Sequence, residues 1–331
     1  MPHLFNTIHL FKSRLKGLPK DIGASLGLHR SFFTKEKGSR ILVYHGVCRK
    51  DHLKFNTLFV TAKAFEKQLR LYKKYCSVIS LEDHYEQRFS KDRFNVCLSF
   101  DDGFANNYQY VLPLLEQYEV PAVFFVTGIR ESGHDILWND VLAIAYKYGP
   151  QQFTFRNEKY IKRRDGKYID AVSGVLLSDR LRTTGFAEKE EMIALLGLYK
   201  ERADEEYWLQ QTREQLRELS SSKWVTIGSH SQYHNDLAKL PAAVAQEDMI
   251  RSKHFLESIT GKEIKAIAFP YGSYNPETIN AAKAAGFSQL LATEFLFPED
   301  GSDTTLRERL TINPFISGVN QLYATISGSY T

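Results

Sequence analysis

The stretch FNVCLSFDDG, residues 94–103, decides the fold of this chain. Its first seven residues are mostly apolar with aromatic ends, which is typical of a strand buried on both faces of a parallel sheet. Asp101, Asp102 and Gly103 follow at once, and a helical pattern covers 105–118. A strand that ends in polar residues and leads into a helix is the repeating unit of a βα fold, whose reactive side chains gather at the carboxyl edge of the sheet.

Similar apolar runs alternate with helical patterns along the rest of the chain. Thr61 is placed to cap a helix over 62–75, and Pro241 can open a helix that reaches Ile259 and stops at Gly261. The runs predict about seven strands of a parallel α/β sheet, at 40–44, 76–79, 94–100, 122–127, 224–227, 265–269 and 287–292.

The region of about 133–222 breaks this rhythm, because two βα units need far fewer residues between the fourth and fifth strands. Residues 156–168 have the pattern of a charged hairpin with Asp165-Gly166 at its turn, and 187–219 have helical spacing. We expect an N-terminal segment over 1–38 and a barrel over 39–331 that carries this largely helical insertion. The insertion is either a cap beside the site or an elaboration of the barrel wall away from it.

Composition limits the partners and the compartment. The net charge of +4 and the pI near 8.7 give no strong basic field, so no nucleic acid partner is expected. The three cysteines lack metal-type spacing. Residues 1–20 mix basic and apolar side chains without a signal or membrane-spanning run, which fits either a packed terminal helix or peripheral contact with an anionic membrane. We expect a cytoplasmic protein, free or at the inner face of the membrane.

Two strand ends carry side chains of the types that bind metals. Adjacent carboxylates at Asp101 and Asp102 repel each other unless a cation or a proton holds them, although Asp-Asp-Gly is also common in turns. His230 and His234 follow the 224–227 strand at a spacing that can bring both imidazoles to one side, although such a pair also occurs as surface decoration. Together they predict an open site for a divalent metal, with Zn²⁺ as the first choice.

Two more strand ends reach the same edge. Phe269-Pro270-Tyr271-Gly272 forms a turn that can aim the Tyr271 backbone N–H at a developing oxyanion, and His45 follows the first strand. Tyr271 is alternatively an ordinary core aromatic and His45 a satisfied structural histidine. The convergence on the predicted metal favours a general acid at His45.

The motifs resemble those of the polysaccharide deacetylase family, also called carbohydrate esterase family four, whose domain is a distorted (β/α)7 barrel. Residues 99–103 match its first motif and 229–234 its second. The resemblance implies Asp101 as catalytic base and Asp102, His230 and His234 as metal ligands. The sequence departs from the pattern in two places. Ala268 stands where the third motif has Arg, and the late Leu-x-His motif is missing.

The missing histidine makes His45 similar to the acid of poly-N-acetylglucosamine deacetylases, where it comes from the N-terminal strand. For the missing arginine, Arg307 and Arg309 near the end of the chain are candidates. The expected activity is metal-dependent hydrolysis of the N-acetyl group of an amino sugar, in a saccharide or glycolipid precursor of N-acetylglucosamine type, with release of acetate. Two alternatives stay open: hydrolysis of a small non-sugar amide, and a catalytically silent saccharide-binding protein.

Overall fold

The computed structural model describes residues 19, 22–23, 30–55 and 57–330. The amphipathic segment expected over 1–20 therefore falls outside the described residues, apart from residue 19. Within the described part of the chain, no helix is both long and apolar enough to span a bilayer.

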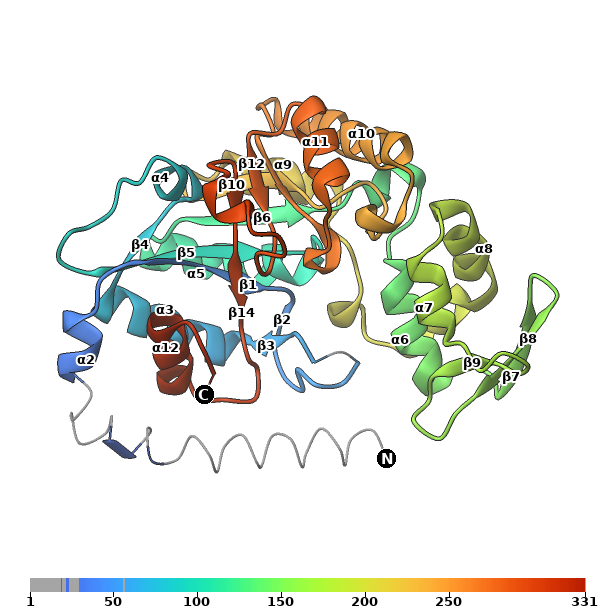
Figure 1. The fold of residues 1–331 in the computed structure, drawn as a ribbon. Coiled ribbons are helices and arrows are strands. Elements are labelled where there is room, and N and C mark those ends of the chain that lie inside the picture. Colours follow the sequence, from blue (N-terminus) through green and yellow to red (C-terminus); the bar gives the residue numbers. More distant parts are fainter. Residues whose placement is uncertain (1–18, 20–21, 24–29, 56, 331) are drawn as a thin grey trace.

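A distorted (β/α)7 barrel forms the main body, as the sequence predicts (Figure 1). All pairs in its sheet are parallel, and neighbouring strands follow the order β1, β5, β6, β10, β11, β12. The chain of 306–311 then closes the sheet, because its first half pairs with β12 and its second half with β1. The strands are β1 (Ser39–Tyr44), β5 (Phe94–Phe100), β6 (Ala122–Val126), β10 (Val225–Ser229), β11 (Ala266–Ala268), β12 (Gln289–Leu291), β13 (Leu306–Arg307) and β14 (Arg309–Thr311).

The sequence-based strand set needs one correction. All seven expected runs are strands, but the run at 76–79 (β4, Cys76–Ile79) pairs only with the first half of β5. The two short strands that close the barrel, within 306–311, do not follow from the sequence pattern. They escape pattern reading because they are short, charged and interrupted at Glu308.

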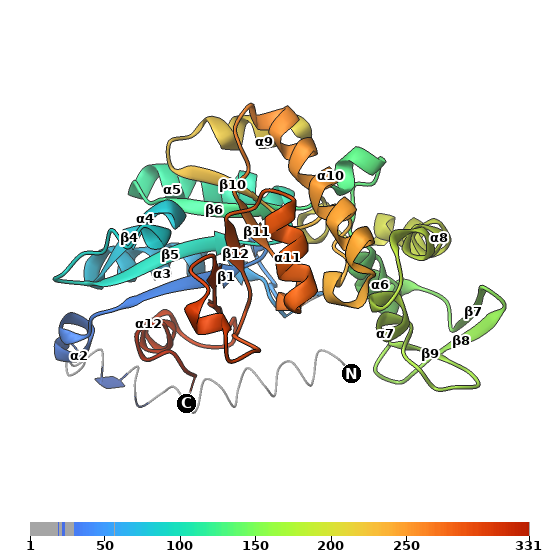
Figure 2. The same cartoon turned by 45° about the horizontal axis from the view of Figure 1, so that its top comes forward.

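Helices cover the outside of the sheet (Figure 2). Thr61 caps α3 as expected, since its hydroxyl accepts a hydrogen bond from the Ala64 N–H, and Gly261 ends α10 with φ of 65°. The helix expected over 105–118 instead starts with a π-helical turn at Asn107–Val111. The helices around the barrel are α2 (Arg30–Lys35), α3 (Ala62–Tyr75), α4 (Leu81–Tyr85), α5 (Leu112–Tyr118), α9 (Arg213–Ser221), α10 (Ala242–Thr260), α11 (Pro276–Ala284) and α12 (Gly318–Ser327).

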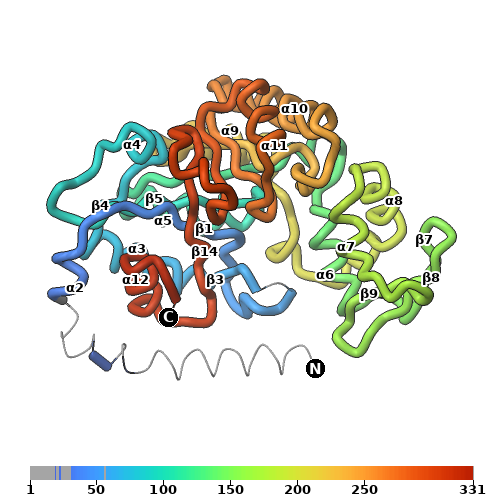
Figure 3. Tube along the Cα trace, viewed as in Figure 1, coloured from blue at the N-terminus to red at the C-terminus, as the bar shows by residue number. Residues whose placement is uncertain are grey.

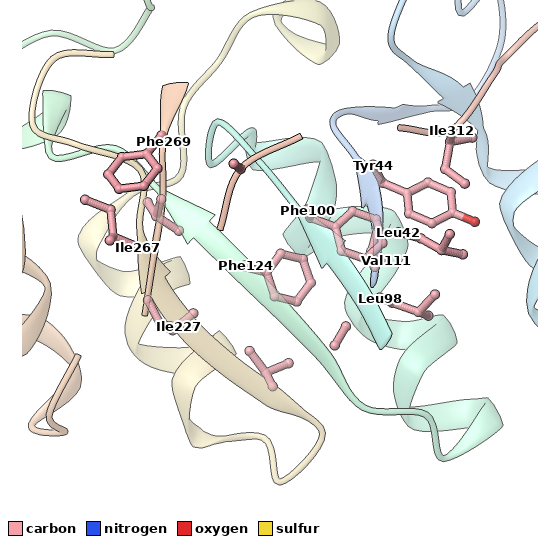
Figure 4. Close-up of a cluster of buried hydrophobic side chains, with 14 of the residues drawn as sticks. Leu42, Tyr44, Leu98, Phe100, Val111, Phe124, Ile227, Ile267, Phe269 and Ile312 are labelled. Carbon is pink, nitrogen blue, oxygen red and sulfur yellow. The ribbon is translucent and has the colours of Figure 1, made fainter. Parts of the chain in front are cut away.

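Alternating strand residues build two apolar layers. The outer layer faces the helices and includes a row of stacked rings, Tyr44 on Phe100 at 5.1 Å and Phe100 on Phe124 at 5.0 Å (Figure 4). The inner layer fills the barrel with strand residues such as Phe125 and Ala268. The side chains that point inward at the carboxyl ends of the strands are in position to build a site.

The insertion leaves the barrel after β6 and has its own core of residues from Ile136 to Trp208 (Figure 3). By contrast, Leu216 and Leu219 of α9 pack in the core of the barrel. The charged hairpin is present, with Gly166 at φ of 89° in its turn. The longer elements of the insertion are α6 (Trp138–Tyr148), β7 (Gln152–Phe155), β8 (Glu158–Lys162), β9 (Tyr168–Asp170), α7 (Leu177–Arg182) and α8 (Phe186–Leu196).

Candidate active site

The two carboxylates leave β5 in different directions. The Asp101 N–H donates to the Tyr44 carbonyl at 2.9 Å, so this residue still continues the pairing with β1. Asp102 turns away with φ of 75°, a backbone conformation that non-glycine residues seldom adopt. Both side chains are buried. The strained turn therefore separates the two acids and gives each its own neighbours.

Asp102 faces both histidines of the second motif. Its Oδ1 atom lies 3.4 Å from Nε2 of His230 and 3.2 Å from Nε2 of His234, and the three ligand atoms lie within 4.8 Å of one another. Two ligands of a tetrahedral zinc site, each about 2.05 Å from the ion, are about 3.3 Å apart. Oδ1 is buried without a hydrogen bond of good geometry. The cluster therefore fits a divalent metal.

The charges within this cluster support the same interpretation. Burial opposes ionisation of Asp102, but His234 and His230 outweigh it and lower the pKa of this carboxyl well below its usual range. Nδ1 of His230 donates to the Ala268 carbonyl at 2.7 Å, so in the neutral imidazole the Nε2 lone pair faces Asp102 and is free to bind a metal. A histidine held by a backbone carbonyl in this way is oriented for metal binding.

Arg309 of β14 takes the place of the arginine missing at Ala268. Its Nη1 and Nη2 atoms lie 2.8 and 2.9 Å from Oδ1 and Oδ2 of Asp101, and Nη1 lies 3.2 Å from the Ser99 hydroxyl. Burial raises the pKa of Asp101, but the Arg309 charge outweighs burial and the pKa is lowered. Arg307 contacts the Tyr85 ring instead, at 4.7 Å. The geometry thus selects Arg309 from the two candidates.

His45 and Tyr271 also lie at this edge. His45 follows β1, and its charge acts on Asp101 and on Asp102. The Tyr271 ring lies 4.8 Å from the His234 ring, and the residue has φ of 62°. No hydrogen bond of the Tyr271 backbone N–H is found among the described residues. All six residues expected from the sequence are therefore brought together around one centre.

The insertion contributes side chains that motif reading did not identify. Trp138 donates from Nε1 to the His234 carbonyl at 3.1 Å, and the Arg182 guanidinium lies 4.3 Å from the centre of the Tyr271 ring. Burial, followed by the charge of Asp102, raises the pKa of Asp140 well above its usual value. The insertion thus lies beside the site. The sequence signal was limited to the unusual Trp138-Asn139-Asp140 run at the start of a helix.

A buried lysine connects the insertion to the second motif. Lys189 of α8 is completely buried, and its Nζ lies 3.0 Å from the Thr184 carbonyl and 2.5 Å from Oδ1 of Asn235. Asn235 donates to Asp248 at 2.9 Å, and Asp248 accepts from the Gln232 N–H at 2.6 Å. These hydrogen bonds fix the 230–235 loop through Gln232 and Asn235. The insertion therefore helps to fix the position of His230 and His234.

Comparisons with known proteins identify relatives of this chain. The family model described as polysaccharide deacetylase matches residues 90–290. The chain is 21% identical over 287 residues to "Putative polysaccharide deacetylase YxkH" of Bacillus subtilis, covering 84% of this chain and 72% of the relative.

Solved structures share the fold. The deacetylase PplD of Streptococcus pyogenes, solved in complex with acetate, has a TM-score of 0.53 at 18% identity, with 88% of this chain and 99% of that chain covered. IcaB of Ammonifex degensii has a TM-score of 0.54 at 18% identity, with 88% and 97% covered.

Fold and site together define a parallel α/β barrel whose clustered carboxylate and imidazoles suit a divalent metal. More narrowly, the chain belongs to the polysaccharide deacetylase family, because the family model covers well over half of its length and both leading motifs.

Proposed function

We propose that this chain is a metal-dependent N-deacetylase that releases acetate from an N-acetylated amino sugar in a saccharide or glycolipid. The single observation that carries this proposal is the pair of adjacent carboxylates with separate partners. Asp102 faces two imidazoles, whereas Asp101 is held in a bidentate ion pair by Arg309. One acid is thus arranged to bind a metal and the other to accept a proton.

Asp102, His230 and His234 would hold the ion, most simply Zn²⁺. When bound, such an ion polarises the acetamide carbonyl and lowers the pKa of water. Asp101 would take the proton from the attacking water. Arg309 keeps this carboxyl ionised and fixes its direction, because both carboxylate oxygens accept from one guanidinium.

Two further groups complete the reaction. The Tyr271 backbone N–H would donate to the oxygen of the tetrahedral adduct, which carries the negative charge before the C–N bond breaks. His45 would give its proton to the departing nitrogen, so that the products are acetate and a free amine. The proton taken up by Asp101 leaves with solvent or returns to His45 between turnovers.

The presence of Arg309 weighs against a catalytically silent protein. That alternative rested on the missing Arg at position 268 and on the missing late histidine. Arg309 makes the contact to Asp101 that the absent arginine would make, and His45 stands at the same edge of the barrel. Both departures from the family pattern therefore have a replacement from another strand.

Acetate release from N-acetylglucosamine oligomers tests the proposal. Wild type, Asp101→Asn and the exposed control Asp92→Asn are compared after removal of metal with a chelator and after addition of Zn²⁺. We expect zinc-dependent release by wild type and by Asp92→Asn, and a loss of about 10²–10⁴-fold in Asp101→Asn. Equal rates for wild type and Asp101→Asn would refute the proposal.

A further inference from the structure

A large basic cavity lies where the insertion meets the barrel. Its volume is about 710 Å³, within the range of ligand pockets. One wall is the loop between β2 (Val47–Cys48) and β3 (Val60–Thr61), and the other is the end of α6 with the β8–β9 turn (Figure 1). Six of its fourteen lining residues are cationic and one is acidic: Lys54, Lys147, Lys162, Arg163, Arg164, Lys167 and Asp165.

Most of these charges have no anionic partner. Arg163 pairs with Asp165 at 3.3 Å, and Lys162 donates to the Ala145 and Gly149 carbonyls at the end of α6. For the other four, no salt bridge to a carboxylate is found in the part of the chain that the structure describes. Like charges gathered in a cavity repel one another more strongly than on an open surface, so an anion that enters relieves this repulsion.

Two of the lysines are held in place by aromatic rings. Nζ of Lys54 lies 5.6 Å from the centre of the Phe55 ring, and Nζ of Lys147 lies 5.2 Å from the same ring. Nζ of Lys54 also lies 5.0 Å from the Tyr207 ring. Cation–π contacts of this kind restrict flexible side chains. The two ammonium groups therefore face the cavity with less entropy to lose on binding a ligand.

The loop that lines the cavity follows the candidate active site along the chain. His45 directly follows β1, and the chain then runs through β2 into the loop that carries Lys54 and Phe55. The insertion holds this loop, because the Arg49 N–H donates to Glu206 at 2.9 Å and the Tyr207 hydroxyl donates to the Lys50 carbonyl at 2.7 Å. The insertion thus fixes the chain segment that leads from the reactive centre to the basic wall.

We propose that this cavity binds an anionic group, a phosphoryl or a carboxylate, carried by the saccharide that the enzyme deacetylates. The inference rests on the proposed function and narrows the substrate to an acidic or phosphorylated saccharide. Arg and Lys are the side chains that bind such oxygens by charge-assisted hydrogen bonds. A concave cavity fits a group that enters it, whereas a bilayer surface would need cations on a convex or flat face.

Binding of two soluble anions to the metal-loaded protein tests this directly. Calorimetry is carried out with inorganic pyrophosphate and with trigalacturonate, on wild type and on the variant Lys147→Gln, Arg164→Gln, Lys167→Gln. The control Lys63→Gln, Lys67→Gln, Lys91→Gln removes the same charge from exposed positions outside the cavity. We expect wild type to bind at least one of the two probes. The cavity variant should bind that probe about tenfold more weakly than wild type, and the control should bind it as wild type does. The probe that binds identifies the phosphoryl or the carboxylate source.

Three outcomes would overturn the inference: wild type binds neither probe, both triple variants lose affinity equally, or only vesicles with anionic lipid bind through these residues. Hydrolysis of neutral N-acetylglucosamine oligomers is measured in parallel and is expected to be unchanged in the cavity variant. If wild type binds a probe but hydrolyses no acetylated saccharide, the proposed function fails while the anion site stands. Thermal melting of each variant shows that it is folded.

Discussion

Replacing Arg309 with methionine is the sharpest test of how the site is built. Arg309→Met keeps an unbranched side chain of similar length but removes the charge and the fork of donors. The guanidinium and Asp101 are both buried, with side chains 0% and 5% exposed. The substitution therefore leaves an ionised carboxylate in the barrel interior without its counter-charge. It also removes the hydrogen bond that Arg309 donates to the Ser99 hydroxyl.

Breaking a buried ion pair from one side costs about 3–5 kcal/mol, because the remaining charge is desolvated and unpaired. Without Arg309, only the charges of His230 and His45 oppose the effect of burial, so the pKa of Asp101 is higher than in wild type, where it is lowered. The difference in unfolding free energy between the two proteins grows as the pH rises through the ordinary range of an Asp carboxyl, near pH 3.9. The stability loss is thus larger at pH 7 than at pH 3.

The assay combines urea unfolding at several pH values with steady-state deacetylation. We expect kcat to fall by about 10²-fold, because the base is no longer held in its direction, and the acidic limb of the pH–rate profile to move to higher pH. Arg309→Lys keeps the charge without the bidentate fork and is expected to fall between wild type and Arg309→Met.

Arg307→Met is the matched control, two residues away on the same closing strand and in contact with the Tyr85 ring rather than with Asp101. A merely structural role for Arg309 would lower stability without moving the acidic limb. The reasoning is refuted if Arg309→Met keeps the wild-type pH profile, or if Arg307→Met shifts the profile as far.

Three further outcomes follow from the geometry. His45→Asn should reduce hydrolysis of an N-acetyl amide by about 10²–10⁴-fold and have little effect on p-nitrophenyl acetate, whose leaving group needs no proton; equal losses on both substrates would exclude His45 as the acid. Trp138→Phe removes the hydrogen bond to the His234 carbonyl, so zinc affinity measured by competition with a chelator should fall by about 10-fold, and an unchanged affinity would contradict this supporting role. Burial lowers the pKa of Lys189 to about 8, so the native state releases this proton before the unfolded state does. The unfolding free energy of wild type relative to Lys189→Met should therefore rise between about pH 8 and pH 10.4, by on the order of 3 kcal/mol. Parallel curves for the two proteins over this range would show that Lys189 does not titrate there.

The parts of the site that follow from local sequence were predictable. Asp101 and Asp102 come directly after a seven-residue buried strand, and His230 follows a second strand of the same sheet. Strand ends of a parallel sheet meet at one edge, so the order of polar residues along the chain was sufficient to bring these side chains together. By contrast, the insertion contacts the site through Trp138 and Lys189, and these contacts depend on how a separate core docks, which no local pattern encodes.

Arg309 shows why the remainder needs the structure. Arg307 and Arg309 are two residues apart on the closing chain, and alternation predicts that both point to the same side. They differ in their position along the barrel axis, because Arg307 contacts the Tyr85 ring and Arg309 contacts Asp101. Ala268 belongs to the inner layer, and its small side chain leaves interior space for a guanidinium from another strand. In a small barrel, inward side chains from different strands converge on the same volume. A positive charge can therefore stand beside Asp101 whichever of these strands supplies it.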